Sequence, residues 1–244
     1  MKTLHDNFLS KEMYGGKAAN LSSLAHLPEL SVPCGFVLRP GEPCPTHLVP
    51  ALSIWRAVRS SAVGEDGFMQ SFAGQFNTYL NIKSDDALKR AIAKVRYIPE
   101  RVLVYNNGKA PEVCVIVQDM IQSVRAGTCF TSEPVTGERD RMVIEYVYGL
   151  GDKLVSGKVT PTTRTYMKDI HVIYPMSIGD AHILYCAKVI EDHFGCPQDI
   201  EWAEDAMGKL WILQARPITA LPPIVSTHTD TTLKSSAEMP SQQK

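Results

Sequence analysis

Apolar residues recur along the chain in two spacings, one typical of strands and one typical of helices. Runs rich in β-branched and aromatic residues, bounded by Gly, Pro or Asp, predict strands. These runs cover residues 31–38, 76–82, 112–121, 126–132, 141–148 and 165–174, and a closing hairpin spans 196–219. Apolar residues at helical spacing predict helices that open at Gly16 and at Ser84 or Asp85, and a third over residues 180–194. Strands with helices between them favour an α+β fold of at least two layers.

The composition is that of an ordinary globular protein. The chain has 244 residues, of which 44% are hydrophobic and 21% are charged, and its formal net charge is −1. This is enough for a core in one large domain or in two small subdomains, and the balanced charge argues against nucleic acid or a membrane surface as partner. No apolar run approaches the roughly 20 residues of a membrane-spanning helix. The N-terminus lacks the apolar core of a secretory signal, so we expect a cytoplasmic protein with reduced cysteines and no zinc site. Residues 225–244 are rich in Ser, Thr and Gln, and we expect a disordered tail there.

The closing hairpin, CPQDIEWAEDAMGKLWILQARPIT, carries polar side chains at alternate positions of two apolar strands. Strand geometry puts Asp199 and Glu201 on one face, and Gln214 and Arg216 likewise share a face. A two-residue turn at 206–207 would place Asp199 opposite Gln214, whereas a three-residue turn with its glycine in the left-handed region would shift the register by one. Because unpaired charges are costly to bury, we expect the four groups to meet on one face with phosphates and Mg²⁺, which prefers carboxylate and amide oxygens. The alternative is that Arg216 simply pairs with Glu201.

Two other segments are candidates for binding an anion. In AVRSSAVGEDGFMQSFAGQF, residues 57–76, a glycine-containing loop can fold over an anion and Arg59 can donate two parallel hydrogen bonds to phosphate. The alternative is a hairpin loop with a surface arginine. In YGGKAANL, two glycines precede Lys17 at a helix start that favours anions, and the alternative is an ordinary helix cap. The segment GLGDKLVSGKV matches neither a Walker A loop nor a dinucleotide fingerprint.

Taken together and in this order, these segments resemble the N-terminal nucleotide-binding domain of the pyruvate phosphate dikinase and phosphoenolpyruvate synthase family, which includes rifampicin phosphotransferase. The resemblance covers nearly all of residues 4–219. The matching stretches are GGKAANL, VPCGFVL, AVRSSAVGED, SFAGQFNTYLN, VQDMI, AGTCFTSEPVTG, VIEYVYGLGDKLVSGKVTP, PQDIEWA and LWILQARPIT. The resemblance implies an α+β, ATP-grasp-like fold in which two subdomains, residues 1–117 and 118–224, clasp a cleft that holds ATP and Mg²⁺.

The resemblance also implies roles for individual residues. Lys17, Arg59 and Arg216 would contact the ATP phosphates and are the expected catalytic residues. Glu201 and Gln214 would be the Mg²⁺ ligands. The other expected ATP contacts are a closing loop with Ser71, Gly74 and Gln75, a basic residue before the hinge at Arg101, Gln118 and Met120 beside the adenine, Glu145 facing the cleft, and Asp199 on the ribose or metal side. Catalysis would consist of positioning and of electrostatic stabilisation of phosphoryl transfer.

The sequence departs from the family in what it lacks. Family enzymes pass a pyrophosphoryl group of ATP to a histidine on a swivelling domain, and a third domain holds the acceptor. None of the seven histidines of this chain lies in the family's Ser-His-Ala context. We therefore expect a stand-alone module that passes a phosphoryl or pyrophosphoryl group to a partner chain with such a histidine, or directly to a small molecule. The alternative is a non-catalytic module in which bound ATP regulates a partner.

Overall fold

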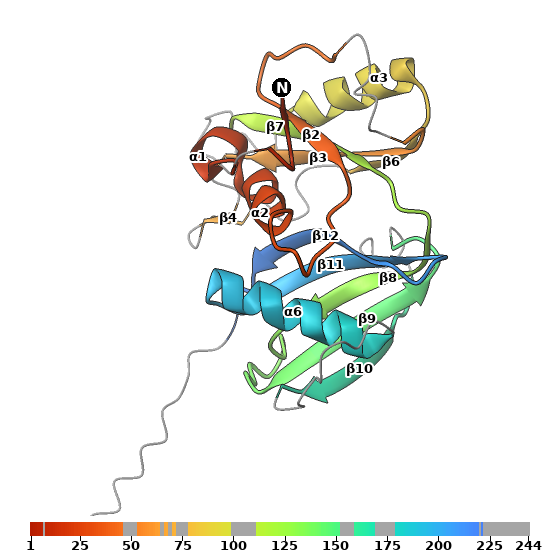
Figure 1. The fold of residues 1–244 in the computed structure, drawn as a ribbon. Helices are drawn as coiled ribbons and strands as arrows, with labels where there is room; N and C mark the ends of the chain where they lie inside the picture. Colours follow the sequence, from red (N-terminus) through yellow and green to blue (C-terminus); the bar gives the residue numbers. More distant parts are fainter. Residues whose placement is uncertain are drawn as a thin grey trace, which may run out of the picture.

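The chain forms two antiparallel sheets of five strands each, seen in the computed structural model of Figure 1. The structure describes residues 1–6, 8–45, 53–63, 66–67, 70–71, 78–98, 111–151, 159–168, 179–219 and 221. The strand order of the first sheet is β1 (Lys2–Thr3), β2 (Gly35–Leu38), β7 (Val113–Asp119), β3 (Arg56–Ala62) and β6 (Tyr79–Ile82). The order of the second sheet is β10 (Thr162–Met167), β9 (Arg141–Tyr148), β8 (Ser123–Phe130), β11 (Gln198–Asp205) and β12 (Leu210–Pro217). A separate short pair joins β4 (Asp66–Gly67) to β5 (Gln70–Ser71).

Helix α3 (Asp85–Arg96) covers one face of the first sheet. Ser84 caps the helix, because its hydroxyl accepts a hydrogen bond from the backbone N–H of Ala87 at 3.2 Å. The apolar positions of α3 recur every three or four residues and are at most 3% exposed; they are Leu88, Ala91, Ile92 and Val95. They form one buried cluster with alternate strand residues such as Val58 and Val115. The opposite face of this sheet is not covered by α3 and is the face that can contact α2 and the second sheet.

Helix α6 (Asp180–Phe194) lies across one face of the second sheet (Figure 1). Its Ile183 and Ile190 belong to a second buried cluster with Ile200 and Trp202 of β11. The helix ends at Gly195, whose φ of 68° lets its N–H bond back to the last turn. The face of the second sheet that packs against α6 is thus part of the hydrophobic core, and its opposite face carries the polar side chains described below.

Two N-terminal helices, α1 (Lys11–Tyr14) and α2 (Gly16–Leu24), lie between β1 and β2 in the chain. Helix α2 packs against both β3 of the first sheet and β12 of the second. Gly15, between the helices, has a φ of 78°, and a Cβ there would lie 2.5 Å from Ser61 Oγ and 2.7 Å from the carbonyl oxygen of Ala62. Only glycine allows this approach, so the glycine pair brings the start of α2 against strand β3.

The predicted elements agree with the structure except in a few places. The three helices and the α+β class are confirmed, and each predicted strand is present, β9 with the predicted bounds and the others with changed ones; β2 begins at Gly35 and β10 at Thr162. Residues 169–178, predicted as the end of that strand, lie outside the described residues, as does the expected tail at 225–244. The expected boundary between residues 117 and 118 falls inside β7, all of which pairs in the first sheet. The division into two subdomains at that point stays a prediction.

Candidate functional site

The closing hairpin contains a turn and a bulge that together set its register. Gly208 has a φ of 76°, and the backbone N–H of Asp205 donates to the carbonyl oxygen of Lys209 at 3.1 Å. This is the three-residue turn, and the two-residue alternative is wrong. Further along, a β-bulge leaves Leu213 without a partner on β11, because Trp202 pairs with Ile212 and the preceding residue pairs beyond Leu213. The turn and the bulge each shift the register by one, so together they keep the alternation of faces.

The resulting register places the four polar side chains on one face. Asp199 lies opposite Arg216, and Glu201 lies opposite Gln214. Directly opposed residues of an antiparallel pair project to the same side, and positions 199 and 201 share a face. The prediction that the four groups meet on one face is confirmed, whereas the pairing of Asp199 with Gln214 is wrong. We call this side of the second sheet, with Asp199, Glu201, Gln214 and Arg216, the charged face.

A row of polar residues crosses the charged face in direct register. Glu145 of β9 pairs with Thr128 of β8, Thr128 pairs with Glu201, and Glu201 pairs with Gln214. Neighbouring strands are about 4.8 Å apart, which puts the backbones at Glu145 and Glu201 roughly 10 Å apart. The Thr128 hydroxyl between them is buried and has no hydrogen-bond partner among the described residues. Glu145 thus lies on the charged face, as the sequence predicts.

Two ion pairs hold the carboxylates of the charged face. Arg216 donates from Nε and Nη2 to Asp199 Oδ2 at 2.9 and 2.8 Å. Arg59 donates from Nη1 to Glu201 Oε2 at 3.1 Å and to the carbonyl oxygen of Leu213 at 3.3 Å. The alternative in which Arg216 pairs with Glu201 is therefore wrong. The bulge at Leu213 has a local use here, because it frees a carbonyl that accepts a hydrogen bond from Arg59.

Arg59 is placed by a strand that the sequence pattern missed. The sequence pattern predicted no strand between residues 56 and 62, whereas Arg56–Ala62 forms β3, which pairs with β7 along its whole length. Both faces of β3 are covered, so the hydrophobic alternation that signals a half-buried strand is absent. Arg59 and Ser61 project away from α3, on the face turned toward α2 and the second sheet. The two sheets therefore meet at the ion pair of Arg59 with Glu201.

Lys17 lies in the first turn of α2, close to the same strand. The backbone N–H of Ala18 donates to Ser61 Oγ at 3.0 Å, and that hydroxyl donates to the carbonyl oxygen of Tyr14 at 2.7 Å. Ser61 is two residues beyond Arg59 and shares its face of β3. The structure thus brings the start of α2, with Lys17, beside the strand of Arg59.

Two residues expected beside the adenine lie at the end of β7. Gln118 is 1% exposed and donates from Nε2 to the carbonyl oxygen of Pro33 at 3.3 Å. It pairs in register with Ala57, so it lies on the same face of the first sheet as Arg59. Met120 is buried, and its sulfur accepts a hydrogen bond from the backbone N–H of Asn81 at 3.0 Å. These positions leave the adenine contact a prediction.

The backbone of Ser71 belongs to β5, and its side chain is not among the described ones. Gly74, Gln75 and Arg101 lie outside the described residues.

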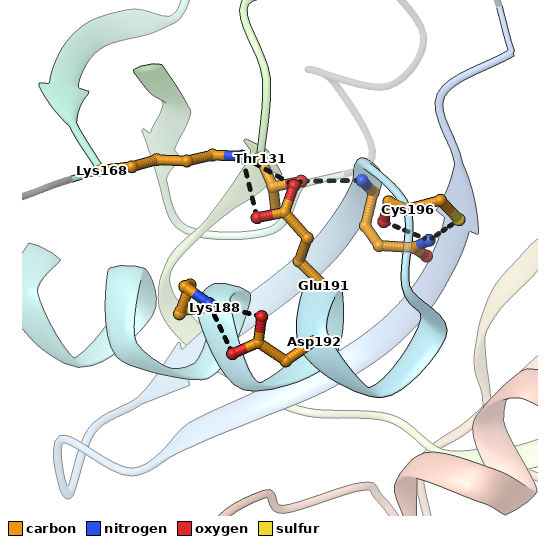
Figure 2. Close-up of polar contacts among 7 residues, drawn as sticks. Thr131, Lys168, Lys188, Glu191, Asp192 and Cys196 are labelled. Carbon is orange, nitrogen blue, oxygen red and sulfur yellow. Dashed lines mark hydrogen bonds and ion pairs between the residues drawn. The ribbon is translucent and has the colours of Figure 1, made fainter. Parts of the chain in front are cut away.

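A partly buried polar network on the helix side of the second sheet contacts the strand that carries Asp199 (Figure 2). Glu191 of α6 accepts hydrogen bonds from Lys168 at 2.7 and 2.8 Å and from the Thr131 hydroxyl at 2.9 Å. The backbone N–H of Gln198 donates to that same hydroxyl at 2.8 Å. The network ties α6 to the ends of β8 and β10 and to the start of β11, one residue before Asp199.

The environment of Asp199 shifts the pKa of its carboxyl group. Burial raises its pKa above the ordinary 3.8, Arg216 opposes this, and the nearby Glu201 adds to the rise. Its second oxygen, Oδ1, is buried without a hydrogen-bond partner among the described residues. One salt bridge therefore does not fully compensate this carboxylate.

The donor set of the charged face fits a hard divalent cation bound together with an anion. Glu201 offers a carboxylate, Gln214 an amide oxygen directly opposite, and Asp199 the unpartnered Oδ1. Oxygen donors of this kind suit Mg²⁺, and two guanidinium groups beside them suit phosphate.

Sequence reasoning missed two groups of the site. The Thr128 hydroxyl could have been found, because alternation in AGTCFTS gives Thr128 the same face of its strand as Phe130. In the structure this strand lies between the strands of Glu145 and Glu201, and Thr128 pairs with both residues. The Leu213 carbonyl could not, because a bulge leaves no mark in a run of apolar residues.

The fold is α+β with two five-stranded antiparallel sheets, and its charged face combines oxygen donors with guanidinium groups. The sequence profile described as "Pyruvate phosphate dikinase, AMP/ATP-binding domain" matches residues 51–188 and 182–237. The chain belongs to this family of AMP/ATP-binding domains. Among the described residues, no helix is long and apolar enough to cross a membrane.

Similar proteins agree with this assignment. The chain is 35% identical to the probable phosphoenolpyruvate synthase of Archaeoglobus fulgidus, over 69% of this chain and 27% of that protein. It is 36% identical to the rifampicin phosphotransferase of Bacillus subtilis, over 69% of this chain and 24% of that protein. The chain thus spans about a quarter of the length of these relatives. The solved D-alanine–D-alanine ligase of Coxiella burnetii is similar with a TM-score of 0.49 and 12% identity, over 88% of this chain and 49% of that one. The family assignment rests on the sequence match and not on this structural likeness.

Proposed function

We propose that the charged face binds ATP together with Mg²⁺, and that the ligand takes over the two ion pairs found there. The observation that carries the proposal is the pairing of Arg59 with Glu201 and of Asp199 with Arg216. A metal–nucleotide complex offers a cation for the acids and phosphates for the guanidinium groups. Each buried charge then keeps an opposite charge beside it when the pairs separate.

The proposed roles follow from the chemistry of each group. Lys17, Arg59 and Arg216 bind the phosphates, and Glu201 with Gln214 binds Mg²⁺. Bound Mg²⁺ would neutralise the charge that develops on the phosphate oxygens during transfer. The residues proposed for the rest of the nucleotide site are Ser71, Gly74, Gln75, Arg101, Gln118, Met120, Glu145 and Asp199.

We further propose that the chain is an ATP-dependent phosphotransferase. Relatives with the names phosphoenolpyruvate synthase and rifampicin phosphotransferase support an acceptor of phosphoryl or pyrophosphoryl groups. The acceptor is either a histidine on a partner chain or a small molecule. Because the arginines and the metal act by position and charge, transfer needs the acceptor to reach the phosphate end of the charged face.

The test is to incubate the protein with Mg-ATP, with and without a cell extract, and to resolve AMP from ADP. AMP that depends on the extract supports a partner histidine, and ADP in its absence supports direct transfer. Glu201→Gln should abolish the product. The matched control is Glu204→Gln, because Glu204 lies on the same strand, is also paired with an arginine at 2.8 Å, and faces the opposite side. Product formation that survives Glu201→Gln would overturn the assignment.

A second candidate function is a module whose bound ATP regulates a partner without turnover. The observation that favours it is the match to a profile described as an AMP/ATP-binding domain, a description that names binding and no transfer. This candidate predicts stabilisation by Mg-ATP, about 2.7 kcal/mol at a hundredfold excess over Kd, with no product under any condition.

A further inference from the structure

Helix α2 connects the two strands that carry the proposed phosphate and metal groups, and it does so through two buried polar side chains. Its start is held by Ser61, two residues from Arg59 on β3. Its middle is held by Asn20, which donates from Nδ2 to the carbonyl oxygen of Ala215 at 2.9 Å. Ala215 lies between Gln214 and Arg216 on β12.

Strand β12 is at the edge of the second sheet, which makes this contact important for its position. An edge strand has backbone groups on its outer side that no neighbouring strand satisfies. Asn20 supplies a donor for one of them, and the carbonyl oxygen of Ser31 accepts the N–H of Ile212 at 2.8 Å. The hydrogen bond from Asn20 is accepted by Ala215, which lies between Gln214 and Arg216. Asn20 therefore fixes β12 at the point that carries these two proposed ligand-binding residues.

The burial of Asn20 is only partly compensated within the fold. The residue is 2% exposed, and its Oδ1 has no hydrogen-bond partner among the described residues. A buried acceptor without a partner destabilises the fold, and an apolar side chain of similar size would avoid this loss. The single bond from Nδ2 to Ala215 is therefore the feature that explains an amide at this position.

Asn20 also shares a side of α2 with Lys17, which precedes it by three residues. Ser61 positions the turn that carries Lys17, and Asn20 positions that same helix against β12. We propose that Asn20, with Ser61, is a positioning residue that sets Lys17 in register with Arg59 on one side and with Gln214 and Arg216 on the other. This inference rests on the proposed function, because it concerns how the same phosphate and metal groups are held.

The test measures the Kd for Mg-ATP by calorimetry and the urea stability of the ligand-free protein for each variant. Asn20→Asp keeps the size of the side chain but sets an ionised oxygen against the Ala215 carbonyl. The inference predicts that Kd rises about tenfold at pH 8, equivalent to one buried hydrogen bond lost. Ser61→Ala, which removes the other link, should raise Kd at least about fivefold by the same reasoning.

The matched control is Ser22→Ala, on the same helix. Ser22 is fully buried, and its hydroxyl accepts a hydrogen bond from the backbone N–H of Leu9 at 3.3 Å, a residue that belongs to neither β3 nor β12. This variant should lose stability while its Kd stays within about twofold of the wild type, because additivity holds for sites without shared partners.

A second readout uses pH. A protonated carboxyl group can donate to the Ala215 carbonyl as the amide does, so the Kd of Asn20→Asp relative to wild type should recover when the pH falls from about 8 to about 5. Equal Kd changes for Asn20→Asp and Ser22→Ala, or an unchanged Kd for Ser61→Ala, would overturn the inference and leave the proposed function standing. A wild-type protein that does not bind Mg-ATP would overturn the proposed function and the inference with it.

Discussion

The ion pair between Arg59 and Glu201 joins the two sheets, so removing it should affect the ligand-free protein measurably. Arg59 Nη1 and Glu201 Oε2 are 3.1 Å apart, and the side chains of Arg59 and Glu201 are only 12% and 23% exposed. At an effective dielectric constant of about 20, the attraction at that distance is about 5 kcal/mol. Desolvation of both groups opposes most of it, so we expect a net coupling of about 1–3 kcal/mol. Arg59 keeps its bond to the Leu213 carbonyl, which limits the loss in the Glu201 variant.

The assay is a double-mutant cycle in urea with Glu201→Gln, Arg59→Met and the double variant, each without nucleotide and with saturating Mg-ATP. Without nucleotide, the double variant should be more stable than the sum of the single effects predicts, because neither single charge remains buried alone. With Mg-ATP, each single variant should lose most of the ligand-induced stabilisation. A coupling below about 0.5 kcal/mol would show that the pair is effectively solvated, and stabilisation that persists in Glu201→Gln would refute Glu201 as a ligand.

Two further perturbations follow from the geometry. Gly15→Ala should destabilise the protein far more than Gly41→Ala. Both glycines have a φ near 79°, which costs an L residue about 1–2 kcal/mol. Only at Gly15 does the new Cβ also meet backbone atoms, at Ala62, whereas Gly41 has open space around it. Urea unfolding of both variants measures the difference, and equal losses would contradict the close approach at Gly15. Asp180→Asn should cost about 1.5–3 kcal/mol at neutral pH, because charged hydrogen bonds are lost. Burial alone would raise the pKa of Asp180, but hydrogen bonds from a tyrosine and two arginines lower it below 3.8 overall. The stabilisation by the ionised carboxylate is therefore present above pH 3.8 and is lost as the pH falls through the lower pKa of the folded state. The difference in unfolding free energy between wild type and Asp180→Asn should narrow in acid, and a difference that stays constant would refute this prediction.

The regular elements were predictable where one face is buried and the other is not. Helix α6 occupies the whole predicted stretch 180–194, and β9 the whole stretch 141–148, because each shows its own periodicity in the sequence. Strand β3 was missed for the opposite reason. It lies in the middle of the first sheet with both faces covered, and its Arg59 and Ser61 are polar because of particular partners and not because of solvent.

The chemistry of the charged face was predictable as a set but not in its pairing. Alternation alone puts Asp199 with Glu201, and Gln214 with Arg216. Which acid pairs with which arginine depends on the bulge at Leu213 and on a strand from the other sheet, and neither leaves a local signal. The link from Asn20 to Ala215 spans 195 positions along the chain, so only the folded arrangement reveals it.

The bulge at Leu213 has a consequence for how the hairpin tolerates change. Leu213 contributes a carbonyl oxygen to Arg59 and one residue of length to the strand, so many side chains could replace it with little effect on the chemistry. Deleting it is different: Gln214 would then follow Ile212 directly and still lie opposite Glu201, but Arg59 would lose the carbonyl oxygen that accepts its hydrogen bond. The hairpin should therefore tolerate a change of side chain at position 213 better than the loss of that residue.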